Sequence, residues 1–316
     1  MKRDLLTIKD LSREEIERIF DLASLHKKRL KEGNPLRPLV GKTLGLIFKK
    51  SSTRTRISFE VGMFQLGGHA LVLNLDHMHW DKCETIHDSA KVFSRYLDAV
   101  AIRTYAQKEV ADLARYSDIP IINALTDDYH PCQVLTDIFT IREKFGKAGD
   151  VRVAYVGDGN NMANSWMMGA ARLGMNLVIC TPEKYAPQEK ILQEAKNFIE
   201  ENRKAGRSPA GSIEVIHDPM QAVRGADVIY TDVWASMGQE DTIEERRKDF
   251  ASFQVNGGLV RSSEKKSLIM HCLPAHRGEE ITDEVIDGDQ SIVFDQAENR
   301  LHVQKGILEF LMVGSV

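Results

Sequence analysis

Short apolar segments alternate along this chain with longer amphipathic segments. The short segments predict strands. A first series of strands is expected at 43–48, 70–74, 99–103 and 120–124. A second series is expected at 151–156, 177–180, 213–216, 228–230 and 267–270. Amphipathic helices are expected between them, for example at 134–144, 163–173 and 188–204. Strands separated by helices in this way indicate parallel sheets built from βαβ units.

Local signals mark a first helix and a domain boundary. Ser12 and Glu15 form an S-x-x-E capping box ahead of apolar residues at helical spacing, which predicts a helix start. Near 145–150 a helical pattern ends on glycine and a new strand begins, so a boundary is expected there. The predicted fold class is α/β, with two domains that each contain a parallel sheet flanked by helices. In open parallel sheets, ligands bind beyond the carboxyl ends of the strands, which is where the polar motifs of this chain fall.

Composition and charge narrow the classes of protein that this chain can represent. The 316 residues carry a formal net charge of −4, which disfavours a general nucleic-acid binder. No apolar run predicts a membrane-spanning helix, and the first residues lack the apolar core of a signal peptide. The cysteines Cys83, Cys132, Cys180 and Cys272 are far apart and form no C-x-x-C pair. We therefore expect reduced thiols in a cytoplasmic protein, with neither a disulfide framework nor a zinc site.

The segment STRTR, residues 52–56, follows the first predicted strand and leads into a predicted helix. Helix N-termini expose N–H groups and the positive end of the helix dipole, so they bind phosphate readily. The hydroxyl groups add donors, and Arg54 can contact phosphate oxygens through two hydrogen bonds. This motif predicts a phosphate or acyl phosphate site, with Ser52 as the helix N-cap. The alternative is a capped surface helix with solvated arginines.

Three further motifs follow in order: HPCQ at 130–133, DVWASMG at 232–238 and HCLPAHR at 271–277. Together with STRTR, they make the chain resemble the ornithine carbamoyltransferases from the first helix through Arg300. STRTR and HPCQ are typical of the wider transcarbamoylase group, and the SMG and HCLP motifs resemble its ornithine branch. The resemblance implies a carbamoyl-phosphate-binding domain at 1–146 and an ornithine-binding domain at 147–297. It also implies that a C-terminal helix at 298–316 packs back on the first domain.

The implied reaction is a carbamoyl transfer. The δ-amine of L-ornithine attacks the carbonyl carbon of carbamoyl phosphate, and phosphate leaves to give L-citrulline. Contacts with carbamoyl phosphate are implied for Ser52, Thr53, Arg54, Thr55, His79, Arg103, His130, Gln133, Cys272, Leu273 and Arg300. The catalytic residues expected among them are Arg103, His130 and Cys272. Arginine biosynthesis is the expected role, although the sequence leaves the catabolic direction open, and neither a cofactor nor a metal is expected.

Two of these residues also have simpler interpretations. His130 could be an ordinary histidine at a helix N-terminus before Pro131, but Gln133 one turn later favours a functional pair. Cys272 could be a buried structural thiol, the commonest role of free cysteine. Because Pro274 ends the strand directly after it, a position in a pocket is favoured. A nucleophilic role is not expected, since an amine can attack an acyl phosphate directly.

The amino-acid side of the site is assigned to two loops. Asn164, after the sequence GDGNNMA, matches the family position that contacts the ornithine carboxylate, and Asp232 is expected to pair with the α-ammonium. Ser236 and Met237 are expected to contact ornithine from a loop that closes as a lid. A helix cap at a strand end is the simpler interpretation of Asp232.

The resemblance also implies a homotrimer in which His79 reaches the active site of a neighbouring subunit. The chain departs from the family pattern before STRTR, where the family commonly has Glu-Lys-Pro and this chain has Lys49, Lys50 and Ser51. It also has Trp80 where a smaller aliphatic residue is frequent.

Other functions remain to be separated from this one. The sequence VGDG at 156–159 suggests an NAD-dependent oxidoreductase, but Met162 occupies the third glycine position of that fingerprint. A non-catalytic homologue is disfavoured because STRTR, HPCQ and HCLP are all intact. Sister transcarbamoylases that act on putrescine, lysine or an acylated ornithine stay open as alternatives.

Overall fold

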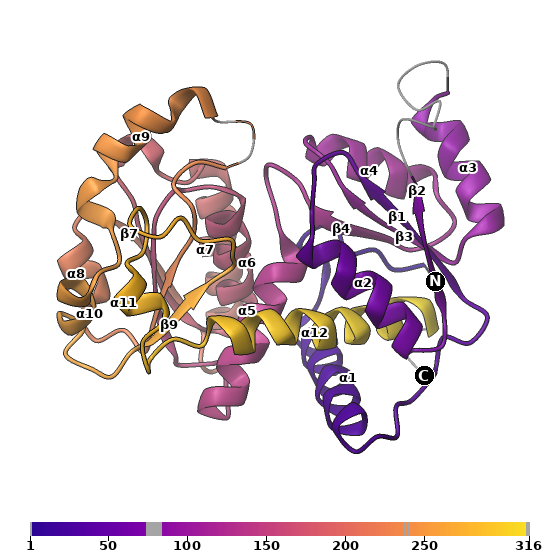
Figure 1. Cartoon of the computed structure of the whole chain (residues 1–316), viewed down its shortest axis with the longest axis horizontal. Helices are drawn as coiled ribbons and strands as arrows, with labels where there is room; N and C mark the ends of the chain where they lie inside the picture. Colours follow the sequence, from indigo (N-terminus) through magenta and orange to yellow (C-terminus); the bar gives the residue numbers. More distant parts are fainter. Residues whose placement is uncertain (1, 74–83, 237, 239, 314–316) are drawn as a thin grey trace. The chain divides into compact units, whose positions relative to one another are not determined.

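The computed structural model describes residues 2–73, 84–236, 238 and 240–313 of the chain (Figure 1). By compactness the chain divides into two units. Unit 1 comprises Met1–Thr136 and Glu298–Val316, and unit 2 comprises Asp137–Ala297. The divisions fall inside two helices, α5 (Pro131–Phe145) and α12 (Val293–Val313).

Unit 1 is built on a parallel sheet with the strand order β2-β1-β3-β4. Its strands are β1 (Thr43–Phe48), β2 (His69–Leu73), β3 (Ala99–Arg103) and β4 (Ile121–Leu125). The helices that lie wholly within the described residues of unit 1 are η1 (Ile8–Asp10), α1 (Arg13–Lys31), α2 (Arg54–Gln65), α3 (Ile86–Tyr96) and α4 (Gln107–Tyr116). Each strand predicted for this part of the chain begins within one residue of the observed strand. The buried strands β1, β3 and β4 leave clear apolar runs, as strands of parallel sheets do.

Helix α1 begins at the predicted capping box. The Ser12 hydroxyl accepts a hydrogen bond from Glu15 N at 3.2 Å, and the Glu15 carboxylate accepts one from Ser12 N at 2.8 Å. Helix α12 crosses α1 closely at Gly306, where an added Cβ atom would lie 2.5 Å from the Ile19 carbonyl oxygen. On the sheet, α3 and α4 bury an apolar cluster against Ile47 and the neighbouring strands. The crossing at Gly306 holds α12, the helix that carries Arg300, against α1.

Unit 2 contains a second parallel sheet with the order β7-β6-β5-β8-β9. Its strands are β5 (Arg152–Val156), β6 (Asn176–Cys180), β7 (Ser212–Ile216), β8 (Val228–Thr231) and β9 (Leu268–His271). Its complete helices are α6 (Asn161–Leu173), η3 (Glu183–Tyr185), α7 (Glu189–Lys204), α8 (Pro219–Val223), η4 (Glu240–Thr242), α9 (Ile243–Asp249), η5 (Ala251–Phe253), α10 (Gly257–Arg261) and α11 (Asp283–Ile286). The predicted α/β class with two parallel sheets is confirmed.

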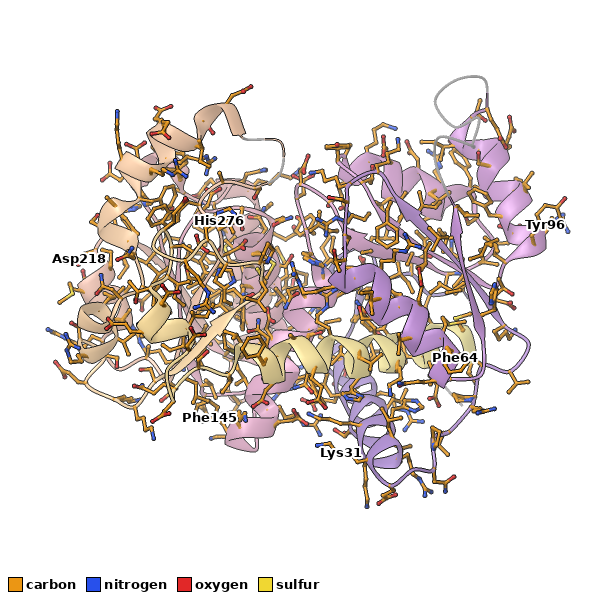
Figure 2. All side chains as sticks on the ribbon, in the orientation of Figure 1. Lys31, Phe64, Tyr96, Phe145, Asp218 and His276 are labelled. Atoms are coloured by element: carbon orange, nitrogen blue, oxygen red, sulfur yellow. The ribbon has the colours of Figure 1, made fainter. Side chains whose placement is uncertain are left out.

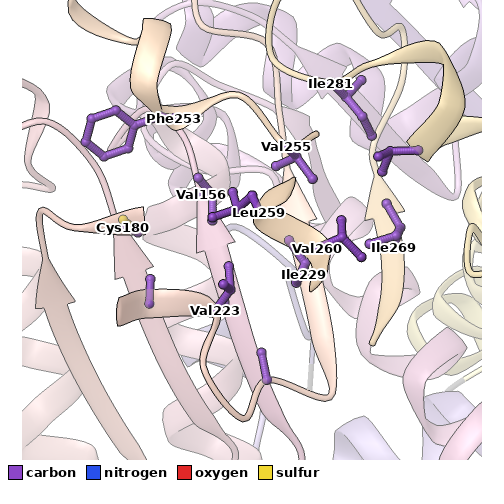
Figure 3. Packing of buried hydrophobic residues seen from close by; sticks show 14 of the residues in the cluster. Val156, Cys180, Val223, Ile229, Phe253, Val255, Leu259, Val260, Ile269 and Ile281 are labelled. Atoms are coloured by element: carbon purple, nitrogen blue, oxygen red, sulfur yellow. The ribbon is translucent and has the colours of Figure 1, made fainter. Parts of the chain in front are cut away.

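The core of unit 2 lies between this sheet and short helices. Val156 of β5, Ile229 of β8 and Ile269 of β9 belong to one buried cluster with Val223 of α8 and Leu259 of α10 (Figure 3). Burial of apolar side chains is the main favourable term in folding. The cluster therefore fixes the strands whose carboxyl ends carry the polar motifs of this unit.

The cysteines and the helices bear on two further expectations. Cys132, Cys180 and Cys272 are free thiols, and Cys83 lies outside the described residues. Within the described ranges, every helix is too short or too polar to cross a membrane.

Candidate active site

In unit 1, three of the predicted motifs start from the same edge of the sheet. Phe48 of β1 is in register with Arg103 of β3, and Arg103 with Leu125 of β4. The Lys49 amide also donates to the Arg103 carbonyl oxygen at 2.8 Å. Since the carboxyl ends of parallel strands meet at one edge, STRTR, Arg103 and HPCQ belong to the same side of this sheet.

The STRTR segment opens helix α2, but one residue later than predicted. Thr53, rather than Ser52, is the N-cap residue, and it has helical angles (φ −82°, ψ −58°) and makes no capping hydrogen bond through its side chain. The helix therefore begins without a side-chain cap at Thr53, and the predicted cap at Ser52 is wrong. Helix N-termini without such a cap suit an external anion. Arg54 is exposed at this end, and Thr55 is buried.

Arg300 of α12 connects STRTR with HPCQ inside unit 1. Its Nη2 atom donates to Thr55 Oγ1 at 3.0 Å, and its Nη1 atom donates to Gln133 Oε1. All three side chains are buried, with at most 4% of their surface exposed. Because a buried guanidinium is costly without acceptors, these bonds fix the orientation of Arg300. Three residues that were predicted from separate parts of the sequence are thus brought into contact.

His130 lies among cationic side chains. Its pKa is lowered well below the usual 6.5, first by burial and then by Arg300, Arg103 and Arg54. The imidazole is therefore neutral at pH 7, and a neutral imidazole can donate one N–H to a carbonyl oxygen. The arginines give this part of unit 1 the positive field that a multiply charged anion such as a phosphate would need.

Lys49, which departs from the family pattern, and the neighbouring Lys50 both have local partners. Lys49 Nζ lies 3.0 Å from Glu109 Oε1, and Lys50 forms an ion pair with Asp127. Lys50 Nζ also lies 4.3 Å from the centre of the Tyr105 ring. The positive charge at Lys49 is thus offset by Glu109.

In unit 2, the ends of β5, β8 and β9 are adjacent. Val156 is in register with Thr231, and Thr231 with His271. The residues that follow are the GDGNN loop, Asp232 and Cys272. Asn160 caps helix α6, because its Oδ1 atom accepts hydrogen bonds from Met162 N at 2.9 Å and Ala163 N at 3.4 Å.

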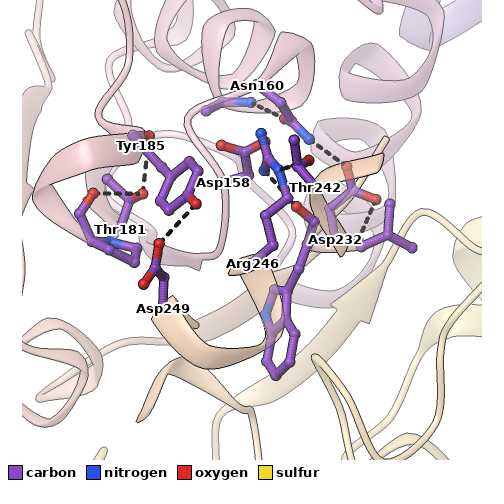
Figure 4. Close-up of polar contacts among 12 residues, drawn as sticks. Asp158, Asn160, Thr181, Tyr185, Asp232, Thr242, Arg246 and Asp249 are labelled. Carbon is purple, nitrogen blue, oxygen red and sulfur yellow. Dashed lines mark hydrogen bonds and ion pairs between the residues drawn. The ribbon is translucent and has the colours of Figure 1, made fainter. Parts of the chain in front are cut away.

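Asp232 joins these three strand ends (Figure 4). Its Oδ2 atom accepts a hydrogen bond from Asn160 Nδ2 at 3.0 Å. Its Oδ1 atom accepts from Val233 N and from the Cys272 thiol, both at 2.8 Å. No helix follows within residues 233–236, so Asp232 is not a helix cap in the described part of the chain. It is a buried carboxylate held at a strand end.

Cys272 is a protonated thiol at neutral pH. Burial raises its pKa well above the usual 9.0, and Asp232 raises it further. Since the thiolate is the nucleophilic form of cysteine, this environment opposes covalent catalysis by Cys272. The sequence interpretation of Cys272 without a nucleophilic role agrees with this chemistry.

A buried pair supports the HCLP segment. Leu273 N donates to His271 Nδ1 at 2.8 Å, so Nδ1 is an acceptor, and the other ring nitrogen, Nε2, lies 3.0 Å from Glu280 Oε1. Leu273 has a left-handed backbone with φ 58°, a conformation that a non-glycine residue adopts at a cost. His271 and Glu280 are fully buried. They hold the main chain at Leu273.

The second glycine of VGDG, Gly159, has a packing explanation. A Cβ atom at Gly159 would lie 2.4 Å from the Tyr185 carbonyl oxygen and 2.5 Å from Pro187 N. Gly159 N donates to the same carbonyl at 3.0 Å. The close approach of 185–187 therefore requires glycine here, and no dinucleotide needs to be invoked.

The remaining predicted residues are distributed as follows. Asn164 is buried in the first turn of α6, where its backbone N–H donates to the Asn160 backbone carbonyl at 3.0 Å. Ser236 is half-buried. His79, Trp80 and Met237 lie outside the described residues. In the described ranges, one group of side chains could hold a metal ion, His276, Glu279 and Glu280, and Arg247 already pairs with Glu279 at 2.7 Å.

Several supporting residues were missed from the sequence. Asn160 could have been found, since an asparagine before an apolar helical run is a common N-cap. Arg246 gave no such signal, because its partner Asp158 is 88 positions away along the chain. Glu280 was also missed, although its partner His271 is only 9 positions away.

Comparisons with known proteins agree along the whole chain. Residues 3–143 match the family profile described as "Aspartate/ornithine carbamoyltransferase, carbamoyl-P binding domain", and residues 149–311 match that of the "Asp/Orn binding domain". The curated "Ornithine carbamoyltransferase" of Thermococcus kodakarensis is 52% identical over 312 residues, covering 99% of this chain and 97% of the relative. The "Ornithine carbamoyltransferase, anabolic" of Pyrococcus furiosus is 53% identical with the same coverage.

Solved structures give the same result. The ornithine carbamoyltransferase structure from Pyrococcus furiosus superposes with a TM-score of 0.94 at 53% identity, covering 100% of this chain and 98% of that one. The ornithine transcarbamoylase structure from Giardia lamblia superposes with a TM-score of 0.88 at 35% identity and covers both chains fully, at 100% each.

Proposed function

The chain belongs to the aspartate/ornithine carbamoyltransferase family, and we propose that it transfers the carbamoyl group of carbamoyl phosphate to the δ-amine of L-ornithine. The products are L-citrulline and phosphate, and the enzyme is a transferase. The observation that carries the proposal is a neutral, buried His130 among Arg54, Arg103 and Arg300, in a chain that matches ornithine carbamoyltransferases over 99% of its length.

Unit 1 supplies the groups that carbamoyl phosphate needs. Arg54, Arg103 and the hydroxyl groups of Ser52, Thr53 and Thr55 would hold the phosphate at the N-terminus of α2. His130 would donate its single N–H to the carbonyl oxygen, together with Arg103 and Thr55. Donors aimed at an oxygen that becomes negative in the transition state typically contribute roughly 10²–10³ in rate each.

The bond changes balance without a covalent enzyme intermediate. The neutral δ-amine nitrogen forms a bond to the carbonyl carbon, and the carbonyl oxygen takes up negative charge in a tetrahedral intermediate. When that charge returns to the carbonyl, the bond from carbon to the phosphate oxygen breaks and phosphate leaves. The amine proton leaves with phosphate or to water. Gln133 and the main chain at Cys272 and Leu273 would accept from the carbamoyl NH₂ group.

Unit 2 supplies the groups that an amino acid needs. Asp232 would pair with the α-ammonium, Asn164 would contact the α-carboxylate, and Ser236 and Met237 would contact the rest of the substrate. The buried Asp232 carboxylate has acceptor capacity for a cation in addition to its bond from Asn160. The Cys272 thiol would orient Asp232, to which it donates.

Citrulline formation with a panel of amines tests the proposal. Purified protein is given carbamoyl phosphate with L-ornithine, putrescine, L-lysine or an acylated ornithine, and ureido product and phosphate are both measured. We expect L-ornithine to give the highest kcat/KM. A higher value with putrescine, lysine or an acylated ornithine would assign the chain to a sister transcarbamoylase. A role in arginine biosynthesis is supported by the word "anabolic" in the name of the Pyrococcus furiosus relative.

The assembly that we propose is a homotrimer whose active sites each receive His79 from an adjacent subunit. Support comes from unit 1, which exposes apolar side chains on α2, β2 and α3. Variants Arg54→Ala and His79→Ala, each of low activity, are dissociated and reassembled together. A shared site restores activity, because some interfaces then combine an intact Arg54 with an intact His79. If the mixture shows only the sum of the two residual activities, the active site is not shared between subunits.

The place of action that we propose is the cytoplasm. Its support is the free state of Cys132, Cys180 and Cys272, since thiols stay reduced in that compartment.

A further inference from the structure

A buried arginine outside the predicted site joins two segments of unit 2 (Figure 4). Arg246 of α9 donates from Nη1 to Asp158 Oδ2 at 2.8 Å and to the Trp234 carbonyl oxygen at 2.6 Å. Its Nε atom donates to Thr242 Oγ1 at 3.3 Å. The guanidinium carbon lies 4.7 Å from the centre of the Tyr185 ring. Arg246 thus contacts four residues through one side chain.

The two segments that Arg246 joins are those assigned to the amino-acid substrate. Asp158 precedes Asn160 and Asn164, which begin helix α6. Trp234 lies between Asp232 and Ser236. Asn160 also donates to Asp232, so the start of α6 and the 232–236 segment are connected twice: directly by Asn160, and through Arg246, which donates to Asp158 and to the Trp234 carbonyl.

Simple stability does not account for this pair. Arg246 and Asp158 are 9% and 6% exposed, so both charges have lost most of their water. Buried ion pairs can often be replaced by apolar residues without loss of stability, because desolvation offsets the attraction between the charges. The contacts favour a geometric role, because the Arg246 guanidinium sets where the Trp234 carbonyl lies relative to the start of α6.

We propose that Arg246 and Asp158 are positioning residues that set the spacing between the start of α6 and the 232–236 segment, and thereby select an acceptor that carries both an α-ammonium and an α-carboxylate. This inference rests on the proposed function, because it assigns the two segments to ornithine. Neither residue needs to touch the substrate. Asp232 and Asn164 would bind the two charged groups, and the ion pair would keep them at the spacing of an α-amino acid.

Steady-state kinetics of Arg246→Lys, Arg246→Gln and Asp158→Asn test the proposal. We expect the KM for ornithine to rise, by up to roughly 10²-fold as for other small displacements of a binding group, while the KM for carbamoyl phosphate changes little. The ratio of kcat/KM for ornithine to that for putrescine should fall, because putrescine has no α-carboxylate. The neighbouring Arg247→Gln is the matched control: Arg247 lies on the same helix and makes only exposed ion pairs in the described structure, with Glu244 and Glu279.

A double variant and a pH profile separate positioning from general loss of structure. Asp158→Asn combined with Arg246→Gln should be no worse than the more affected single variant, because the two residues act as one unit. Burial raises the pKa of Asp158 to about 6, against the opposing effect of Arg246 and with a further rise from Asp232. Tyr155 and Tyr185 are the other titratable side chains at this point. In the wild type, the kcat/KM for ornithine should therefore fall below about pH 6. Asp158→Asn should not show this fall.

Two results would overturn the inference. One is an equal rise in the KM of both substrates, and the other is an Arg247→Gln variant that matches Arg246→Gln. If Arg246→Gln does not fold, Arg246→Lys keeps the charge beside Asp158 and still loses the Trp234 contact. A wild type that prefers L-lysine would refute the proposed function instead, and a selective loss toward lysine, which carries the same α-ammonium and α-carboxylate, would still support the positioning role. A wild type that prefers putrescine would overturn both, because putrescine has no α-carboxylate.

Discussion

At the scale of single residues, the two arginines of STRTR have different environments. Arg54 is exposed at the N-terminus of α2 and acts on His130, whereas Arg56 pairs with Glu60 at 2.7 Å along the surface of the helix. We expect Arg54→Ala to raise the KM for carbamoyl phosphate by roughly 10- to 150-fold, since a hydrogen bond to a charged group is worth about 1.5–3 kcal/mol.

Arg56→Ala is the control for this prediction and should remain near the wild type, because exposed i,i+4 pairs contribute only about 0.3–0.5 kcal/mol. Thermal unfolding of both variants shows whether each is folded. Unchanged kinetics in Arg54→Ala, or equal losses in the two variants, would remove Arg54 from the phosphate site.

His130 predicts a dependence of stability on pH. In the unfolded chain histidine titrates near 6.5, whereas the folded pKa of His130 lies well below that value. Between the two values the unfolded state binds a proton that the folded state does not, so the free energy of unfolding falls as the pH drops below about 6.5. Above pH 6.5, His130 is neutral in both states and no longer lowers the free energy of unfolding.

The measurement is urea unfolding at pH 7 and at pH 5.5, for the wild type and for His130→Gln. The wild type should lose more stability between the two pH values than the variant, with a slope from this one group of at most about 1.4 kcal/mol per pH unit. Equal losses in both proteins would show that His130 does not carry this linkage.

How much of the site could be read from the sequence depended on the distance between partners. STRTR and HPCQ are local motifs that identified Thr55 and Gln133, and the family resemblance added Arg300, which contacts both in the structure. Arg246 was not identified, because its meaning depends on Asp158, 88 positions away. The error at Ser52 is of another kind: a serine before a helix suggests a cap, but the N-cap position falls at Thr53, whose side chain makes no capping hydrogen bond.

At the scale of elements, the strands were the most predictable part of the fold. Each strand buried in a parallel sheet is a short apolar run, so its position follows from the pattern of apolar residues along the chain. Helix crossings were not predictable, because they depend on which residues of two distant helices meet. Gly306 of α12 is an example: only the fold shows that it faces the backbone of α1 at Ile19.

Glycine-to-alanine changes in two helices test this crossing. Alanine is favoured over glycine in a helix by about 1 kcal/mol. In Gly306→Ala, however, the new Cβ atom would lie 2.5 Å from the Ile19 carbonyl oxygen and 3.2 Å from Ala23 N. We expect this variant to be destabilised by about 1–3 kcal/mol, because two backbones must move apart.

Gly62→Ala in α2 is the matched control. Its nearest contact would be Lys305 Cγ at 3.5 Å, an ordinary van der Waals distance, so a small gain in stability is expected. Urea midpoints at equal protein concentration, with unchanged slopes, measure both effects. A stabilised Gly306→Ala would show that α12 does not cross α1 so closely.

At the scale of the whole molecule, an apolar surface of unit 1 predicts self-association. Ile57, Val61 and Phe64 lie at helical spacing along α2 and are 54%, 36% and 77% exposed. Tyr96 at the end of α3 is 78% exposed, and Figure 2 shows both Phe64 and Tyr96 at the surface. Clustered exposed apolar side chains of this size mark protein–protein contacts in soluble proteins.

Phe64→Lys should therefore weaken the proposed homotrimer, because a lysine charge would have to lose its water at an apolar contact. Sedimentation velocity over a range of concentrations measures the distribution of species, and the variant should dissociate at concentrations where the wild type remains assembled. Phe294→Lys is the matched control, since Phe294 is 70% exposed but belongs to unit 2. If the homotrimer completes its active sites with His79, dissociation of Phe64→Lys should also lower citrulline formation, and activity should return as protein concentration rises. A wild type that sediments as a monomer, or a Phe64→Lys variant that stays assembled like Phe294→Lys, would place the interface elsewhere or remove it.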